Sequence, residues 1–525
     1  MSYDSADDLR ARYGPAWRWL VTIAGMIGVL SMVLSMTTVN VAVPDVMGAF
    51  GIGQDKAQWM SSAFAATMAA GMVMNAWVSG LLGERRTFLA ALAVFSVGAV
   101  LGGMAPNEDV LIFARVLQGF SSGVGQPLVM ALIFQAFPPE RRGTAMGVFG
   151  LGVVFAPAIG PTLGGLMIEL FSWRYVFFIA LPFCAIAAGL SAIFMPTQPW
   201  PKRLPKFDWG GFVLMCVGLG GLMIGLAGGQ REGWTSDTTL SRLGVGAAAT
   251  IAFVVWELRV PTPLLDVRLF ANRQFAAAGM IAFFFGAAML GSTYVGPVFV
   301  QTVVNFTPLM SGLMVMPAGL MLAVIFPMAG RMSDRLSPAG MIAGGLVLFS
   351  AGFATMSTAD VDTAFWTLAG IFMISRLGLG FINPALNAFS LNALPASQVR
   401  QGAGAVNLIR QLGGAFGTIL FVAFLETRMA FHAEALTATQ DFANRSSAEM
   451  LDRIAQLLRA AGLSEATRHA RAIEHLGQMV HAQAQALAFN DTFLMISGVT
   501  LLALIPALMA TRRRRVVVPK VAPAE

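Results

Sequence analysis

An arginine inside an apolar stretch is the feature of this sequence that most clearly indicates chemistry. Arg115 lies several residues inside an apolar stretch that begins at Leu111. A charge near the centre of a membrane helix costs about 2.5–3.5 kcal/mol on insertion scales. Because a residue of that cost usually faces a cavity or a partner, we interpret Arg115, with Gln118 and Gly119 beside it, as part of a coupling or gating site. The alternative is a structural arginine that binds backbone carbonyls.

Two more arginines lie inside apolar stretches. The segment Arg115-Val-Leu-Gln-Gly-Phe has a counterpart in Arg376-Leu-Gly-Leu-Gly-Phe, so Arg376 is a second candidate for coupling or gating, although it could only hold helices together. Arg410 lies about two turns into its own apolar stretch. It could line a cavity, or its long side chain could extend to the membrane interface.

A dense group of small residues follows the first arginine stretch. Its members are Gly152, Gly160, Pro161, Gly164 and Gly165. Small residues at this density let two helices approach closely, and a proline removes one hydrogen bond of the helix. We predict a tight helix–helix seam that blocks leakage.

Composition shows what must position these residues. Hydrophobic residues make up 56% of the 525 residues and charged residues only 12%, whereas soluble domains are about 25% charged. Runs of about 20 apolar residues predict membrane helices. We predict fourteen of them, over 18–43, 57–81, 87–106, 109–136, 143–168, 174–195, 208–229, 240–258, 274–301, 308–331, 338–358, 364–392, 402–427 and 487–511. Lysine and arginine concentrate in alternate short loops, which predicts that both termini are cytoplasmic.

The repeated arginine segment predicts an all-α membrane protein built from two related halves. The halves are six-helix bundles over 18–195 and 274–511, and residues 196–273 form a linker with two inserted helices. Short cytoplasmic tails cover 1–17 and 512–525. Parallel halves around a midplane cavity commonly rock against each other to give alternating access.

One loop is much longer than the others. Residues 428–486 carry apolar residues at helical spacing, including Leu451 and Ile454, and predict a helical hairpin that projects outward from the membrane. All four histidines lie in this segment, at spacings that do not suggest a metal site. We interpret the hairpin as a docking surface for a partner protein.

Carboxylates are absent from the middle of every predicted span. Glu169, Glu426 and Asp491 lie near the outer ends and are the candidates for proton coupling by position; Asp208 and Glu257 lie near the inner ends. A partly buried carboxyl group near water can titrate usefully. The alternative for each one is an interfacial acid that is always ionised.

Polar and aromatic residues within the spans suggest a substrate cavity. Polar side chains in membrane helices often join helices instead, so only some of these should face a substrate. The predicted cavity residues are Ser35, Asn40, Gln126, Phe284, Tyr294, Asn383, Asn387, Asn407, Arg410 and Gln411. No phosphate-binding loop is present, so we expect coupling to an ion gradient, with no cofactor, no metal and no enzymatic site.

Several motifs in order along the chain resemble the major facilitator superfamily, specifically its fourteen-helix drug:proton antiporters of the EmrB/QacA type. Besides the arginine and glycine–proline segments, they are TTVNVAVP at 37–44, FDWGG at 207–211, WELRVPTPLLDVRLF at 256–270, GRMSDR at 330–335 and GAGAVNLIRQLGGAFGT at 402–418. The resemblance implies a proton-coupled multidrug exporter in a Gram-negative inner membrane. It also implies a periplasmic adaptor and an outer-membrane channel as partners through 428–486.

The sequence departs from the family pattern at two positions. The first helix of the family usually carries an aspartate where this chain has Ser35, and the inner loop after the second helix usually carries one where this chain has Gly80. We therefore expect the gating interaction of that loop, which here retains Arg85, to be partly delegated to Asp334 and its neighbour Arg335.

The intramembrane arginines and the missing mid-span carboxylate favour neutral or weakly acidic substrates. Two alternatives stay open: an exporter of one dedicated metabolite or fatty acid, and a membrane sensor or scaffold that transports nothing.

Overall fold

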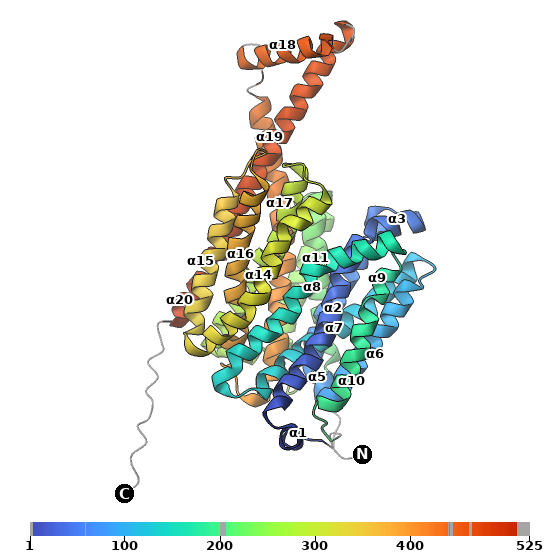
Figure 1. Cartoon of the computed structure of the whole chain (residues 1–525), viewed down its shortest axis with the longest axis vertical. Helices are drawn as coiled ribbons and strands as arrows, with labels where there is room; N and C mark the ends of the chain where they lie inside the picture. The colour runs from blue at the N-terminus through green and yellow to red at the C-terminus, as the bar shows by residue number, and fades with distance from the viewer. Residues whose placement is uncertain are drawn as a thin grey trace.

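The computed structural model describes residues 4–57, 59–199, 206–438, 440, 445–460 and 465–511, and most of these residues lie in helices joined by short loops. Two groups of long helices lie side by side (Figure 1). The first contains α2 (Trp17–Val41), α5 (Trp59–Leu82), α6 (Glu84–Gly103), α7 (Glu108–Ala136), α8 (Arg142–Leu170), α9 (Tyr175–Phe178) and α10 (Ala180–Phe194). The second contains α13 (Arg273–Thr302), α14 (Pro308–Arg335), α15 (Pro338–Met356), α16 (Phe365–Leu391), α17 (Val399–Thr437), α19 (Glu465–Leu502) and α20 (Leu504–Thr511). The inserted pair is α11 (Trp209–Glu232) and α12 (Asp237–Glu257).

Every predicted span coincides with a helix. Among the described residues, 13 helical stretches are long and apolar enough to cross a membrane, and the remaining predicted span, 143–168, coincides with the 29-residue helix α8. Two spans contain a break that the apolar pattern did not predict, between α9 and α10 and between α19 and α20. Pro182 and Pro506 lie four residues beyond Phe178 and Leu502, where α9 and α19 end, and proline has no N–H to continue the ladder.

Each group has its own apolar core. One core contains Phe88, Phe95 and Phe134 of the first group, and the other contains Phe285 and Phe349 of the second. The groups meet where α14 packs on α8 and where α17 packs on α5 and α7. The predicted domain boundaries remain a prediction, and the tail 512–525 lies outside the described residues.

The helix α1 (Ala6–Tyr13) and α20 lie at one end of the bundle, and α18 (Arg445–Ala460) lies at the other (Figure 1). We call these the α1 end and the hairpin end. The start of α8 belongs to the α1 end, because an Nη2 of Arg10 in α1 donates to the carbonyl of Gln135 at 3.5 Å.

The segment 428–486 comprises the last turns of α17, then α18, then the first half of α19. The helix α17 continues well past the predicted end of its span, to Thr437, and α19 runs without a break from the projection into the bundle. Ile454 of α18 and Ala472 of α19 are buried, and α18 packs on α19.

Candidate gates and buried arginines

Arg115 is fully buried between α7 and α5. Its Nε donates to the carbonyl of Met60 at 3.0 Å, and one Nη donates to Oε1 of Gln118 at 2.9 Å. The guanidinium stands 4.2 Å from the ring centre of Phe64. Gln118 in turn donates to Oγ of Ser35 on α2 at 3.3 Å. The hydroxyl that occupies the family's acidic position is therefore linked to the arginine through one glutamine.

This network lacks a counter-charge. Arg115 forms no ion pair within the described residues, and its second Nη is buried without a hydrogen-bond partner there. A buried, incompletely satisfied cation attracts negative charge or an acceptor group. Gly119 permits the close approach of α7 to α5, because a Cβ at that position would fall 2.9 Å from the carbonyl carbon of Phe64.

Arg376 is buried but weakly held. An Nη2 of Arg376 donates to Oγ1 of Thr293 on α13 at 3.5 Å, and its guanidinium stands 6.0 Å from the ring centre of Phe372. The structure therefore gives the second arginine a looser environment than the first, without an ion pair among the described residues. Tyr294, which the sequence placed in the cavity, is 49% exposed.

Arg410 anchors a polar cluster where the two groups meet. It donates to Oδ1 of Asn383 on α16 at 3.1 Å and to Oδ1 of Asn407 one turn earlier on α17. Asn407 then reaches the first group, because its Nδ2 lies 3.1 Å from Sδ of Met130 on α7. The structure thus brings together three of the predicted cavity residues.

The other predicted cavity residues do not join this cluster. Gln126 and Asn387 are buried, and Oδ1 of Asn387 has no hydrogen-bond partner among the described residues. Gln411 is half-buried, and Phe284 packs against the core of the second group. The side chain of Asn40 lies outside the described residues.

Asp334, at the end of α14, caps the first turn of α8. Its Oδ1 accepts from the backbone N–H of Gly143 at 2.6 Å and its Oδ2 from that of Thr144 at 2.9 Å, and the Thr144 hydroxyl also donates to it. A carboxylate at a helix N-terminus satisfies free N–H groups and complements the helix dipole. Asp334 therefore fastens the second group to the first at the α1 end.

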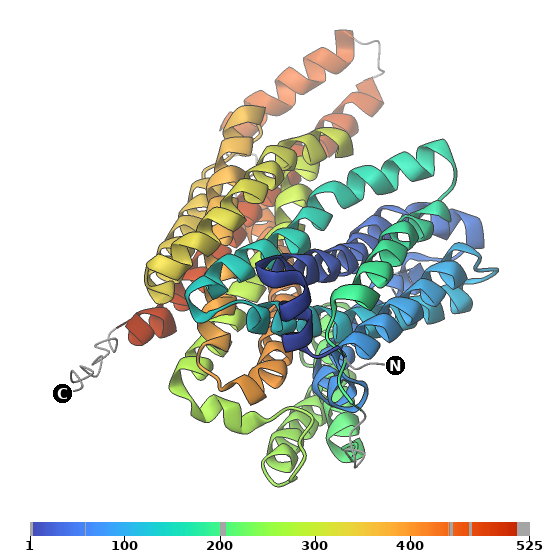
Figure 2. The same cartoon turned by 60° about the horizontal axis from the view of Figure 1, so that its bottom comes forward.

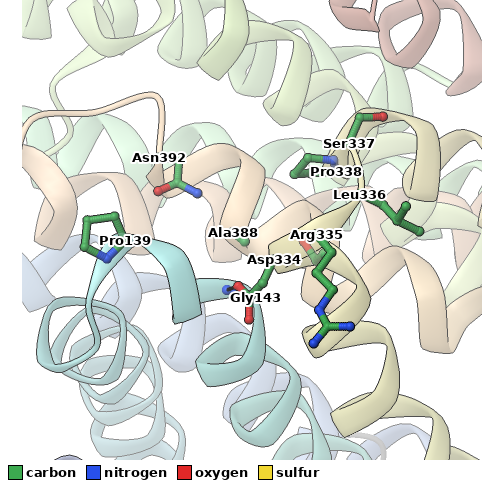
Figure 3. A pocket seen from close by; sticks show the side chains of 10 residues that line it. Pro139, Gly143, Asp334, Arg335, Leu336, Ser337, Pro338, Ala388 and Asn392 are labelled. Atoms are coloured by element: carbon green, nitrogen blue, oxygen red, sulfur yellow. Dashed lines mark hydrogen bonds between the residues drawn. The ribbon is translucent and has the colours of Figure 1, made fainter. Parts of the chain in front are cut away.

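A polar cavity of about 300 Å³ lies beside this cap (Figure 3). Pro139 and Gly143 line it from the first group, and Asn392 lines it from the second. A second contact between the groups lies nearby, where Arg142 donates to Oδ1 of Asn392 at 3.1 Å. Arg335 also lines the cavity but is exposed, and its guanidinium points away from Asn392 in Figure 3.

Sequence reasoning missed the glycines that make this contact possible. A Cβ at Gly143 would stand 2.6 Å from the carbonyl oxygen of Gly330, and one at Gly147 would stand 2.5 Å from that of Phe326. The spacing of Gly143, Gly147 and Gly150 was the signal, since residues three and four apart share one helix face. The helix α8 thus has two glycine faces, and this one meets α14.

The predicted seam is the other face of α8, against α2. A Cβ at Gly160 would lie 3.0 Å from Cβ of Thr37, and one at Gly164 would lie 3.1 Å from the carbonyl oxygen of Thr38. Gly152 is less tight, at 3.4 Å from Met26. Gly165 does not belong to the seam, because a Cβ there would meet nothing within 4 Å. The side chain of Pro161 is not among those described.

The inner loop after α5 differs from expectation. Arg85 donates to Oγ1 of Thr197 at 2.8 Å and lies 3.9 Å from the carboxylate of Asp4, so it holds the chain near α1. Within the part of the chain that the structure describes, it forms no hydrogen bond or ion pair with the second group. Glu84, which the sequence reasoning missed, is buried, and the positive charge near it is Arg400 at the start of α17. Glu84, and not Arg85, faces the second group.

The three outer acids occupy different environments. Glu169 and Glu426 are exposed. Asp491 on α19 is partly buried, and its Oδ2 lies 2.7 Å from Nε of Arg428 and 2.6 Å from Nε2 of His432, both on α17. His432, which the sequence analysis placed on the docking surface of the hairpin, therefore joins an ion-pair cluster at the base of the hairpin.

Sequence comparison decides the family. Residues 16–418 match the family profile described as "Major Facilitator Superfamily". The chain belongs to that superfamily. Its members are transporters, so this multi-pass membrane protein is a transporter and not an enzyme.

Individual relatives confirm the resemblance to EmrB-type transporters. The chain is 29% identical over 448 residues to the "Probable multidrug resistance protein EmrY" of Escherichia coli, covering 83% of this chain and 86% of that one. It is 28% identical over 481 residues to the "Multidrug export protein EmrB" of Haemophilus influenzae, covering 90% and 92%. It is 32% identical over 404 residues to an uncharacterized MFS-type transporter, YcnB, of Bacillus subtilis, covering 77% and 85%.

Solved structures confirm the fold. The human organic anion transporter MFSD10 superposes with a TM-score of 0.63 at 15% identity, covering 93% of this chain and 99% of that one. The proton:xylose symporter XylE superposes with a TM-score of 0.56 at 13% identity, covering 95% and 96%. At these identities the likeness concerns the fold alone.

Proposed function

We propose that the protein exports lipophilic neutral or weakly acidic compounds from the cytoplasm in exchange for protons, across a bacterial inner membrane with both termini cytoplasmic. One observation supports the substrate class above the others: Arg115, Arg376 and Arg410 are largely buried and form no ion pair with a carboxylate among the described residues. A permanent cation near three such charges is repelled, whereas an acid or an acceptor group is attracted. The relatives named for multidrug resistance support export.

Alternating access supplies the mechanism. In this conformation two sets of hydrogen bonds fasten the groups at the α1 end. The carboxylate of Asp334 on α14 accepts from the start of α8, and Arg142 donates to Asn392. Release of these contacts would let the groups rock and expose the cluster around Arg410 to the α1 end. The seam between α2 and α8, with Gly160 and Gly164, keeps the first group rigid during that movement.

Transport by reconstituted protein tests the substrate class. We expect proteoliposomes with an imposed pH gradient to move an aryl carboxylic acid and its neutral methyl ester at least tenfold faster than the amine of the same skeleton. These three probes share size and apolar surface and differ in charge. Export of the amine without the acid would overturn the substrate proposal. Movement of none of the three would favour the sensor or scaffold, and movement of only one chemical compound would favour a dedicated exporter.

We propose further that the hairpin end binds a periplasmic adaptor, which in turn would meet an outer-membrane channel. The projection carries exposed apolar side chains, Leu457 on α18 and Ile473 and Met479 on α19, which are 71%, 51% and 41% exposed. Exposed apolar groups rimmed by polar residues are typical of protein–protein contact. The span from 428 to 486 therefore has a surface suited to a protein partner.

Binding to a purified adaptor of the membrane fusion class tests this second proposal. Deleting residues 430–485 should abolish capture, and Leu457→Asp with Ile473→Asp should weaken it at least tenfold while leaving the helices intact. Gln456→Asp, at the exposed position beside Leu457, is the matched control and should bind normally. Equal capture by the deletion variant would exclude the hairpin as the docking site.

A further inference from the structure

Two acids meet at the α1 end of the inserted helix pair. Asp208 is the N-cap of α11, and its Oδ1 accepts from the backbone N–H of Gly211 at 2.9 Å. The indole Nε1 of Trp256, near the end of α12, donates to the same oxygen at 2.9 Å and lies 3.1 Å from the other. Carboxylates that accept several N–H bonds are stabilised in their ionised form. The contacts of Asp208 therefore suit a negative charge.

Glu257, the last residue of α12, has the opposite environment. It is 0% exposed. Its Oε2 accepts a long bond, 3.4 Å, from the backbone N–H of Leu265, and the backbone of Leu264 is a further donor to this carboxyl group, whereas its Oε1 has no hydrogen-bond partner among the described residues. For an ionised carboxylate buried in this way, these weak backbone contacts replace only part of the lost hydration. The contacts of Glu257 therefore suit a neutral carboxyl group.

The unpartnered oxygen of Glu257 lies close to the carboxylate of Asp208. A Cβ built on Gly211 would stand 2.6 Å from Oε1 of Glu257 and 2.6 Å from Oδ2 of Asp208, so the two oxygens are no more than about 5 Å apart. Only a glycine leaves that space open. Two ionised carboxylates at this separation, both buried, repel each other strongly, and such pairs hold one proton between them.

The surrounding charges do not relieve this repulsion. Asp266, in the loop after α12, adds a third negative charge near Glu257. Among the described residues near this end of the inserted helices, the basic side chains are Lys206, Arg259 and Arg268. None of the three forms an ion pair with either acid within the described residues. Arg268 instead donates to the carbonyl of Leu258 at 2.8 Å. A proton is the simplest positive charge that completes the site.

We propose that Asp208 and Glu257 form a proton-binding site, in which Glu257 carries the proton and Asp208 stays ionised beside it. The proton comes from water at the α1 end and returns there. The site lies in the inserted helices, away from Arg115 and from the three outer acids. The site supplies a titratable carboxyl group. The first helix lacks one, because Ser35 occupies the position where the family usually has an aspartate.

The position of the site connects its proton to the two groups of helices. Glu257 holds the loop after α12 through the N–H of Leu265. In that loop Leu264 packs into a core with Phe64 of α5, and Leu269 packs into the core of the second group. Loss of the proton would change how this loop is held, and with it the connection between the groups. This consequence for transport rests on the proposed proton-coupled export, whereas the proton-binding site does not.

Infrared difference spectroscopy of the purified full-length protein tests the proposal without transport. We expect a C=O stretch of a protonated carboxyl group, sensitive to deuteration, that disappears in Glu257→Gln. Asp208→Asn should keep this band at low pH but lose it at a lower pH than wild type, because Glu257 carries the proton and the neighbouring negative charge that favours it is gone. Glu169→Gln, at an exposed acid, is the matched control and should keep it too. A band unchanged by Glu257→Gln would overturn the proposal, and so would a band lost only with Asp208→Asn.

Two glycine variants separate an effect on the carboxyl pair from an effect on folding. Gly211→Ala places a methyl group between the two carboxyls and should shift or remove the band, whereas Gly220→Ala on the same helix has open space and should leave it unchanged. The band would persist in a protein that transports nothing, so failure of the export proposal is distinguishable from failure of this one. Identical spectra for wild type and Gly211→Ala would contradict an interaction between the two carboxyl groups across that position.

Discussion

Asp334→Ala is expected to weaken closure of the α1 end by about 30- to 100-fold, the largest conformational effect that we predict for a single side chain. The carboxylate of Asp334 accepts from the backbone N–H groups of Gly143 and Thr144 and from the Thr144 hydroxyl. Hydrogen bonds to charged groups contribute about 1.5–3 kcal/mol each, and helix-dipole interactions up to about 2 kcal/mol. Because water replaces part of this in the open state, a net loss of about 2–3 kcal/mol is expected.

Distances between spin labels measure this closure. Labels at Glu140 and Ala396, exposed residues on opposite groups near the cavity, should show a longer, broader distribution in Asp334→Ala. Asp334→Asn, which keeps an acceptor but loses the charge, should fall between that variant and wild type. The control is Asp360→Ala, which removes an exposed carboxylate that, among the described residues, accepts only from the Thr363 hydroxyl. Equal distributions in wild type and Asp334→Ala would show that the cap does not set the closure.

Sequence could predict the helices because a membrane leaves few alternatives. A run of about 20 apolar residues must satisfy its backbone internally, so it becomes a helix whatever its neighbours do. Breaks at Pro182 and Pro506 escaped prediction, because proline inside an apolar run often only bends a membrane helix. The hairpin's helical content followed from the spacing of Leu451 and Ile454, but the continuous passage of α17 and α19 into it did not.

The gate was predictable in part. The absence of an acid at Gly80 directed attention to Asp334, and the structure gives Asp334 a contact between the groups. Its partner is the start of α8, and that depends on how the groups face each other, which no local pattern encodes. The facing of the two groups also explains why the sequence indicated Arg85 for the gating interaction, although Glu84 is the residue that faces the second group.

Two contacts could have been anticipated in part from residue spacing. Arg428 and His432 are four residues apart, so on a continuous helix they share one face, and that face meets Asp491. Gly143 and Gly147 are likewise four apart and form the face that meets α14. In both cases the spacing was visible in the sequence, but the partner helix was not.

Arg115→Met is expected to lower export about 100-fold or more, whereas the matched Arg376→Met should lower it tenfold or less. The two arginines occupy repeated segments and are both buried, but they are held differently. Arg115 makes bonds of 3.0 and 2.9 Å to Met60 and Gln118, and Arg376 makes one bond of 3.5 Å to Thr293. Loss of two charged hydrogen bonds in a buried network costs about 3 kcal/mol or more, which corresponds to about a 100-fold change.

A purely structural Arg115 would give a different pattern. In that case Arg115→Met would lose thermal stability in proportion to export, and Gln118→Leu would be nearly silent because the bond to Met60 remains. If Arg115 acts in coupling, Gln118→Leu should also impair export, because it cuts the link from the guanidinium to Ser35 while the protein stays folded. Arg115→Lys should not restore export, since one ammonium cannot reproduce the planar set of donors that reaches both acceptors. Export at the wild-type rate by a folded Arg115→Met protein would remove Arg115 from the mechanism and leave the cluster around Arg410 as the remaining arginine site.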